Sequence, residues 1–168
     1  MSSLLITAGT LFNMEEAARL QARRRMHHNL HSDYSDPCQR LLNVVCSDSY
    51  IPPHCHDSSQ GSEALFVIRG LFAVVTFDDV GNILSAHRMG SEKYEDGTNN
   101  LAGVQIEPGV WHTLIALSDI GVLLEVKAGP FNPNFPKMVA SWAPEEGSEQ
   151  SYIYLRDLKI RLLSEFFE

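Results

Sequence analysis

The sequence predicts an all-β domain, a small antiparallel barrel or sandwich with helices only at its two ends. Between residues 26 and 128 the chain contains short apolar segments separated by turns rich in Gly, Pro, Asn and Asp. Helical periodicity is restricted to the two ends. With 168 residues and 44% apolar content, the chain is long enough for one domain with a core and too short for two.

The predicted single domain, residues 1–168, has four parts: an N-terminal extension at 1–25, the barrel at 26–128, an irregular wrapping loop at 129–147 and a C-terminal helix at 148–168. In the N-terminal part we expect a short strand at 4–7 and then a helix, capped by Asn13 with Glu16 as its reciprocal acid. Four prolines interrupt the wrapping loop and disfavour regular structure there. In the last part Ser148 is the predicted helix cap, and an apolar stripe follows: Tyr152, Leu155, Leu158, Leu162 and Phe166.

Several predicted strands carry polar side chains that could line a pocket. If R-R-R-M-H-H-N-L-H is extended, His27, Asn29 and His31 share one face with Arg25. A charged pair on one face of the apolar strand V-L-L-E-V-K is also uncommon. The alternative for these residues is a place on the outer surface. We take seven as candidate substrate-binding residues: Arg25, His27, Asn29, Arg40, Asn43, Glu125 and Lys127.

The strongest functional signal is Y-I-P-P-H-C-H at residues 50–56. In an extended strand, His54 and His56 point to the same side and Cys55 points to the other. Glu63, after a six-residue polar loop, can supply an oxygen, and His112 can supply a third nitrogen. Three neutral imidazoles and one carboxylate suit a borderline divalent ion such as Fe, Mn, Ni or Zn. The sequence therefore predicts one metal ion inside the barrel.

This constellation resembles the two motifs of the cupin superfamily: H-C-H, Glu63 and Gly70 in the first, and Gly103, Pro108, Gly109 and His112 in the second. The resemblance implies a cupin-type jelly-roll β-barrel with short N-terminal and C-terminal helices, whose metal lies among the three histidines and the glutamate. Two departures place the chain in a side branch. The second motif usually has an Asn where this chain has Ala116, and its glycine-to-proline spacing is one residue shorter here.

Further segments fall in the order seen in WbuC-type cupin-fold metalloproteins: R-R-R-M-H-H-N-L-H, D-P-C-Q-R-L-L-N, Y-I-P-P-H-C-H, E-A-L-F-V-I-R-G, P-G-V-W-H-T-L, L-L-E-V-K-A-G-P-F and W-A-P-E-E. The match covers about residues 23–146. Members of that family are often encoded among genes for cell-surface polysaccharide synthesis. They usually carry a Lys where this chain has Gly61. The cupin resemblance also implies a homodimer.

Charge and cysteine content narrow the possible partners. The net charge of −8 argues against nucleic-acid and anionic-membrane binding. Three cysteines without regular spacing, Cys38, Cys46 and Cys55, are typical of reduced thiols in a cytoplasmic protein. No apolar run reaches the length of a membrane span. We therefore expect a cytoplasmic protein whose partners are a small molecule and a second copy of itself.

Three functions are compatible with this site. The first is a metal-dependent isomerase or epimerase acting on a small polar metabolite, such as a sugar or sugar nucleotide, with the arginines at 23–25 contacting its anionic part. The second is an Fe(II)-dependent dioxygenase, since His and carboxylate ligands with open positions suit iron and oxygen. The third is a non-catalytic module that binds a small molecule.

Overall fold

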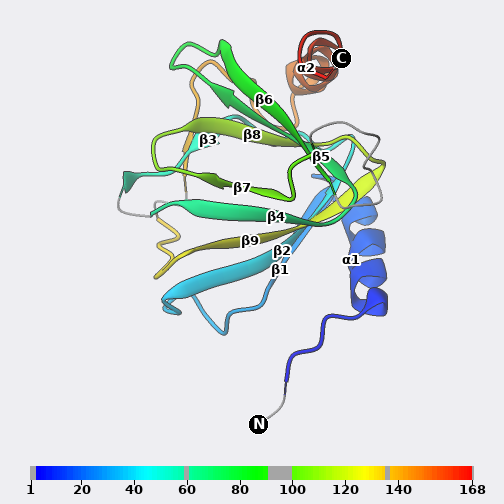
Figure 1. The fold of residues 1–168 in the computed structure, drawn as a ribbon, viewed down its shortest axis with the longest axis vertical. Helices are drawn as coiled ribbons and strands as arrows, with labels where there is room; N and C mark the ends of the chain where they lie inside the picture. The colour runs from blue at the N-terminus through cyan, green and yellow to red at the C-terminus, as the bar shows by residue number, and fades with distance from the viewer. Residues whose placement is uncertain (1–2, 59–60, 91–99, 135–136, 168) are drawn as a thin grey trace.

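The computed structural model describes residues 3–58, 61–90, 100–134 and 137–167, and in these ranges it contains two five-stranded antiparallel sheets and two helices (Figure 1). Sheet A consists, in spatial order, of β1 (Arg25–Asn29), β2 (Cys38–Cys46), β9 (Ile120–Ala128), β4 (Glu63–Arg69) and β7 (Gly103–Ile106). Sheet B consists of β10 (Met138–Val139), β3 (His54–Cys55), β8 (Trp111–Ala116), β5 (Leu71–Phe77) and β6 (Ile83–Gly90). The predicted all-β architecture is thus confirmed.

The two sheets face each other across a buried apolar core to which both contribute. Sheet A supplies Leu65 and Leu123, and sheet B supplies Phe72, Val74 and Met89, each at most 1% exposed. The alternation of the strands sends these side chains inward. The core occupies one part of the space between the sheets, and polar side chains at the end of β3 and the start of β4 occupy another.

Each sheet is covered on its outer face by one helix. Helix α1 (Ala8–Leu20) packs Leu11, Met14 and Ala18 against sheet A, and helix α2 (Glu149–Glu165) packs its leucines against sheet B. Figure 1 shows α1 beside the ends of β1 and β2 and α2 near β6. Within the described part of the chain, neither helix is long and apolar enough to cross a membrane.

The two helices differ in how well the sequence predicted them. Ser148 does cap α2, because its hydroxyl accepts a hydrogen bond from the Ser151 amide at 3.2 Å. The prediction of Asn13 as the first cap was wrong: α1 begins after Thr7, whose hydroxyl accepts from the Thr10 amide at 3.1 Å. The short strand predicted at 4–7 is also absent from this described segment, which is extended without a partner strand.

The apolar stripe of α2 is narrower than its periodicity predicted. Leu155, Leu158 and Leu162 are buried, but Tyr152 is 58% exposed and Phe166 lies at the C-cap. The proline-rich stretch that follows the barrel is mostly irregular, as expected, although β10 forms within it. Residues 135–136 of that stretch lie outside the described ranges.

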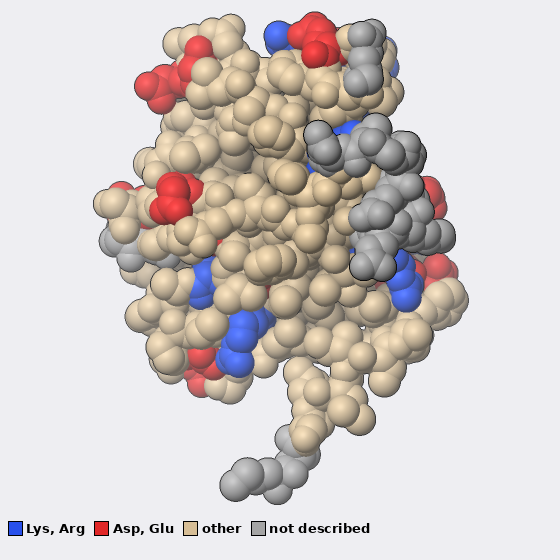
Figure 2. Space-filling model, viewed as in Figure 1, with Lys and Arg blue, Asp and Glu red and all other residues tan. Residues whose placement is uncertain are grey.

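On the face drawn in Figure 2, acidic and basic groups lie in small separate clusters among uncharged residues. The face shown therefore carries no continuous basic surface of the kind that binds a phosphate backbone.

Candidate metal centre

The four predicted ligands converge between the sheets. His54 on β3 is paired with His112 on β8, and His56 follows two residues after His54 on the same side. Glu63 begins β4 in the opposite sheet. The four residues are 1–8% exposed, and one ligand atom from each lies within 4.8 Å of all the others. Such a group could hold one metal ion.

A tight turn helps to position β8 and its histidine. Pro108 and Gly109 stop β7, and Gly109 has a φ of +80°, a conformation that glycine adopts without a steric penalty. The Gly109 amide donates to the His56 carbonyl at 2.9 Å. This bond ties the start of β8 to the strand that carries the other two histidines.

Backbone carbonyls orient two of the imidazole rings. Nδ1 of His54 lies 2.9 Å from the Pro52 carbonyl, and Nδ1 of His112 lies 2.8 Å from the Val110 carbonyl. Since a carbonyl can only accept, Nδ1 carries the proton in both rings, and the lone pair of each neutral ring is on Nε2. Metal-binding histidines are usually held by this kind of hydrogen bond.

The distances to Glu63 are compatible with a proton or a metal cation between the carboxylate and the imidazoles. Nε2 of His112 lies 2.8 Å from Oε1 of Glu63, and Nε2 of His56 lies 3.3 Å from Oε2. A lone pair of a neutral His112 ring would repel a carboxylate oxygen at this distance, so a proton or a metal cation must lie between them. The donor set and its orientation therefore fit a divalent ion.

The pKa shifts of Glu63 and His54 also favour the binding of a cation. Burial alone would raise the pKa of Glu63, but hydrogen bonds with His112 and His56 outweigh it and hold that pKa below its ordinary value. Burial, followed by repulsion from Lys137 and His112, holds the pKa of His54 well below its usual range. The carboxylate is thus charged and His54 is neutral, which are the forms that bind metals.

A pocket of about 300 Å³ opens over this cluster. Five of the candidate substrate-binding residues line it together with the ligands His54, His56 and Glu63: His27, Asn29, Asn43, Glu125 and Lys127. An adjoining cavity of about 640 Å³ shares several of these residues and reaches Arg25. Glu125 and Lys127 both line the pocket and therefore face the interior of the barrel, not its outer surface.

Glu125 and Lys127 form a pair within the pocket wall. Lys127 Nζ lies 2.7 Å from Glu125 Oε1, and Asn43 Nδ2 donates to Glu125 Oε2 at 2.5 Å. The side chains of the pair are only 11–17% exposed. Each partner neutralises the other, so this pair adds polarity to the wall and no net charge.

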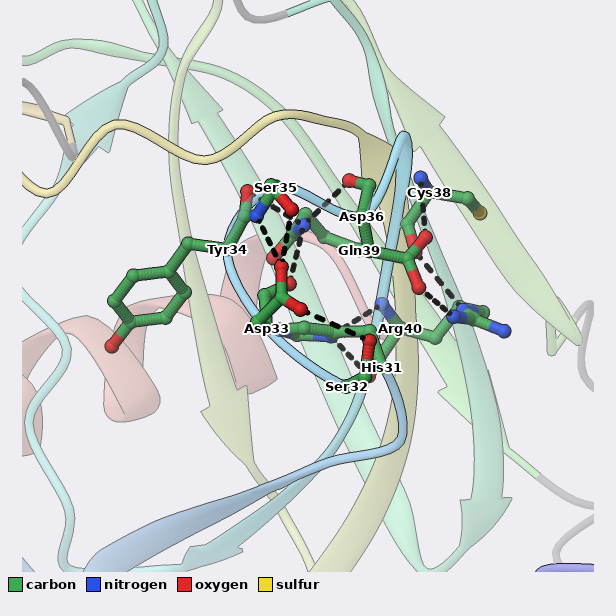
Figure 3. A network of polar contacts seen from close by, with 9 residues as sticks. All are labelled: His31, Ser32, Asp33, Tyr34, Ser35, Asp36, Cys38, Gln39 and Arg40. Carbon is green, nitrogen blue, oxygen red and sulfur yellow. Dashed lines mark hydrogen bonds and ion pairs between the residues drawn. The ribbon is translucent and has the colours of Figure 1, made fainter.

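Arg40 does not line either cavity. Its guanidinium is 2.6 Å from Asp36 and donates to the Cys38 carbonyl, within the polar network that Figure 3 draws. Tyr34 points away from that network (Figure 3) and lies among the residues that line the pocket. In the sequence Arg40 interrupts an apolar segment, a pattern that does not distinguish a pocket residue from a residue that stabilises a turn.

The arginines near residue 25 are bound by the protein's own carboxylates. Arg25 Nη2 lies 2.6 Å from Glu146 Oε1, and Arg23 Nε lies 2.9 Å from the same oxygen. Arg24 is paired with Asp48. Burial lowers the pKa of Arg25, and Glu146 opposes that shift. In this arrangement Arg25 supports the wall of the larger cavity and shares the Glu146 carboxylate with Arg23.

Glu146 provides a test of this ion-pair group. Burial raises the pKa of Glu146, but Arg23 and Arg25 lower it by a larger amount, so this pKa lies below the ordinary value of 4.5. A carboxylate with a lowered pKa adds stability above its unfolded pKa and loses it as the pH falls. With metal removed by a chelator, we expect Glu146→Gln to cost about 1 kcal/mol at pH 7, because water screens the partly exposed pairs. The difference should vanish towards pH 3.

Urea unfolding of both proteins between pH 7 and pH 3 measures this difference. Glu145→Gln is the matched control, since Glu145 is exposed and next in sequence. A Glu146→Gln deficit that stays constant down to pH 3 would mean that the carboxylate charge does not produce it.

Sequence reasoning missed Lys137, which lines both cavities. It precedes β10 in the proline-rich stretch, where no periodicity indicates the direction of a side chain. Only the pairing of β10 with β3 brings it to the metal cluster.

Residues 6–89, half of the chain, match a sequence family described as a domain of unknown function (DUF6016). The chain belongs to this family. The family's description names no activity, and no curated protein matches the sequence.

Solved structures with a similar fold include three whose functions differ. CapF, a capsular polysaccharide assembling protein from Staphylococcus aureus, is 19% identical over 71% of this chain and 32% of its own, with a TM-score of 0.56. The polyketide cyclase RemF from Streptomyces resistomycificus is 18% identical over 79% and 78% of the two chains, with a TM-score of 0.52. Oxalate oxidase in complex with glycolate is 12% identical over 68% and 55%, with a TM-score of 0.50.

These proteins have the cupin fold, and the similarity confirms the predicted cupin-type jelly roll for this member of DUF6016. The chain spans about a third of the length of CapF. At identities below 20%, the similarity concerns the fold and leaves the reaction open.

Proposed function

We propose that this cupin binds one divalent metal ion through His54, His56, Glu63 and His112 and acts on a small polar metabolite in the pocket above it. The observation that carries the proposal is the position of a buried three-histidine, one-glutamate cluster at the base of a polar-walled pocket. Four protein ligands leave two positions of an octahedral ion for substrate or water. A closed structural zinc site would not leave them.

The reaction class that we favour is an isomerisation or epimerisation that moves a proton next to a carbonyl or hydroxyl group. When bound, a divalent ion polarises such an oxygen. The chain's own residues orient the substrate: Asn29, Asn43 and Glu125 offer hydrogen bonds from the pocket wall.

For the substrate we propose a sugar or sugar nucleotide of cell-surface polysaccharide synthesis. The resemblance to WbuC-type cupins supports this class. The description of CapF as a capsular polysaccharide assembling protein suggests the same class. The polar side chains in the pocket wall can form hydrogen bonds with a compound that carries several hydroxyl groups.

Metal analysis of the purified protein by mass spectrometry is the first test, with about one divalent ion per chain expected. Turnover of a member of a sugar-nucleotide panel by the loaded protein would support the isomerase proposal. Oxygen uptake with Fe(II) would instead favour a dioxygenase. Ligand binding that His56→Ala abolishes, with no product formed under any condition, would favour a binding module. A protein that retains no metal after loading would overturn the proposal.

We also propose that the chain forms a homodimer. Leu4, Leu5 and Ile6 are 46–73% exposed on a segment that extends away from the body of the molecule (Figure 1). A second copy that covers them would remove this apolar surface from water. Sedimentation should give a dimer mass, and Leu5→Asp should shift it towards the monomer. A monomer at all concentrations would contradict the proposal.

A further inference from the structure

Lys137 lies beside the metal cluster because of a short strand pairing. It directly precedes β10, which pairs with β3 so that Val139 is opposite His54 and Met138 is opposite Cys55. Lys137 lines both the pocket and the adjoining cavity, and so do His54, Glu63 and Glu125. The side chain therefore borders the space in which a metal-bound compound would lie.

Among the described residues, Lys137 differs from the neighbouring cations in having no carboxylate within ion-pair distance. Lys127 is paired with Glu125 at 2.7 Å, and Arg25 and Arg23 share Glu146. In the described part of the chain, no carboxylate forms such an ion pair with Lys137. Burial, with repulsion from Arg25 and Arg23, lowers its pKa to about 8, and the carboxylates of Glu146 and Glu125 oppose this only in part.

The charge of the pocket also favours an anion. The charged residues among its lining are two carboxylates, Glu63 and Glu125, and two ammonium groups, Lys127 and Lys137, which sum to zero. A divalent ion on the cluster brings the sum to plus two. Such a charge attracts a negatively charged ligand to the pocket, although the whole chain carries −8.

We propose that Lys137 is the binding residue for an anionic group, a carboxylate or phosphate, of the compound that the metal centre holds. The inference rests on the proposed metal function and specifies its substrate class: a compound with one oxygen function for the metal and an anionic group a few bonds away. Lys127 does not fill this role, because Glu125 already neutralises it. The ammonium group of Lys137 donates hydrogen bonds to the anion, and the anion takes the place of the counter-ion that no described carboxylate provides.

Hydroxamic acids that chelate a metal at one end can test the other end separately. The probes are the monohydroxamates of malonic, succinic and glutaric acid, each compared with the analogue whose free carboxylate is an amide. Titration calorimetry on metal-loaded protein should show the best-fitting acid binding at least about tenfold more tightly than its amide. In Lys137→Met this ratio should fall to about one.

Two controls separate the possible failures. Lys159→Met removes one positive charge on α2, outside the pocket, and should keep the wild-type ratio. Acetohydroxamate, which has no anionic end, should bind wild type and Lys137→Met equally. Failure of all hydroxamates to bind would reject the metal centre. Hydroxamate binding without any preference for the acids in wild type, or with an unchanged preference in Lys137→Met, would overturn the role of Lys137 and leave the metal centre intact.

Discussion

Replacing Glu63 with Gln is expected to weaken divalent metal binding by at least about 100-fold, beyond the 10–100-fold usual for groups that only support a ligand. Gln has the same shape but no charge, so it cannot balance the ion in a site where all four residues are at most 8% exposed. It also places an amide 2.8 Å from His112 Nε2, where Glu63 has its carboxylate oxygen. Competition with a chromophoric chelator and mass-spectrometric metal analysis give the affinity.

The matched control is His87→Gln, which removes an exposed histidine of β6, away from the cluster. It should keep one ion per chain and the wild-type affinity. Circular dichroism of the metal-free variants should match wild type, because Gln fits the volume of Glu. If Glu63→Gln retained full affinity, the ion would be bound elsewhere and the assignment of this cluster would be wrong.

Replacing Phe72 with Ala is expected to lower the free energy of unfolding by about 3–5 kcal/mol. Phe72 is fully buried between the sheets. Its ring from sheet B lies against the backbone of Gly121 in sheet A, where an added Cβ would come within 2.5 Å of the ring. Truncation leaves a cavity at the contact between the two sheets, and rigid strands on both sides cannot close it.

Urea unfolding of metal-free protein measures this loss, and Phe12→Ala is the control. Phe12 is 58% exposed on α1, so the same truncation there should change the stability by less than about 0.5 kcal/mol. If Phe72→Ala also costs less than about 1 kcal/mol, the two sheets do not pack through this ring as the structure describes.

The order of residues along the chain was sufficient to predict the features that depend on neighbouring residues. Strand alternation places His54 and His56 on one side, and the Pro-Gly turn before β8 indicates where His112 enters. The Ser148 cap and the buried leucines of α2 could be predicted from the sequence in the same way. The N-terminal helix was predicted less well, because Thr7 and Asn13 are both acceptable caps and the packing of α1 on sheet A favours the earlier start.

Other features depend on residues that are distant in sequence. Glu63 completes the cluster from the opposite sheet, Lys137 reaches the pocket through the pairing of β10 with β3, and Glu146 forms ion pairs with two arginines more than 120 positions earlier. Residue order alone therefore determined the ligand types, their spacing and the β-rich class. Tertiary structure alone decided which charges remain uncompensated in the pocket, because ion pairing depends on the distance between atoms in the folded chain and alternation along a strand does not specify it.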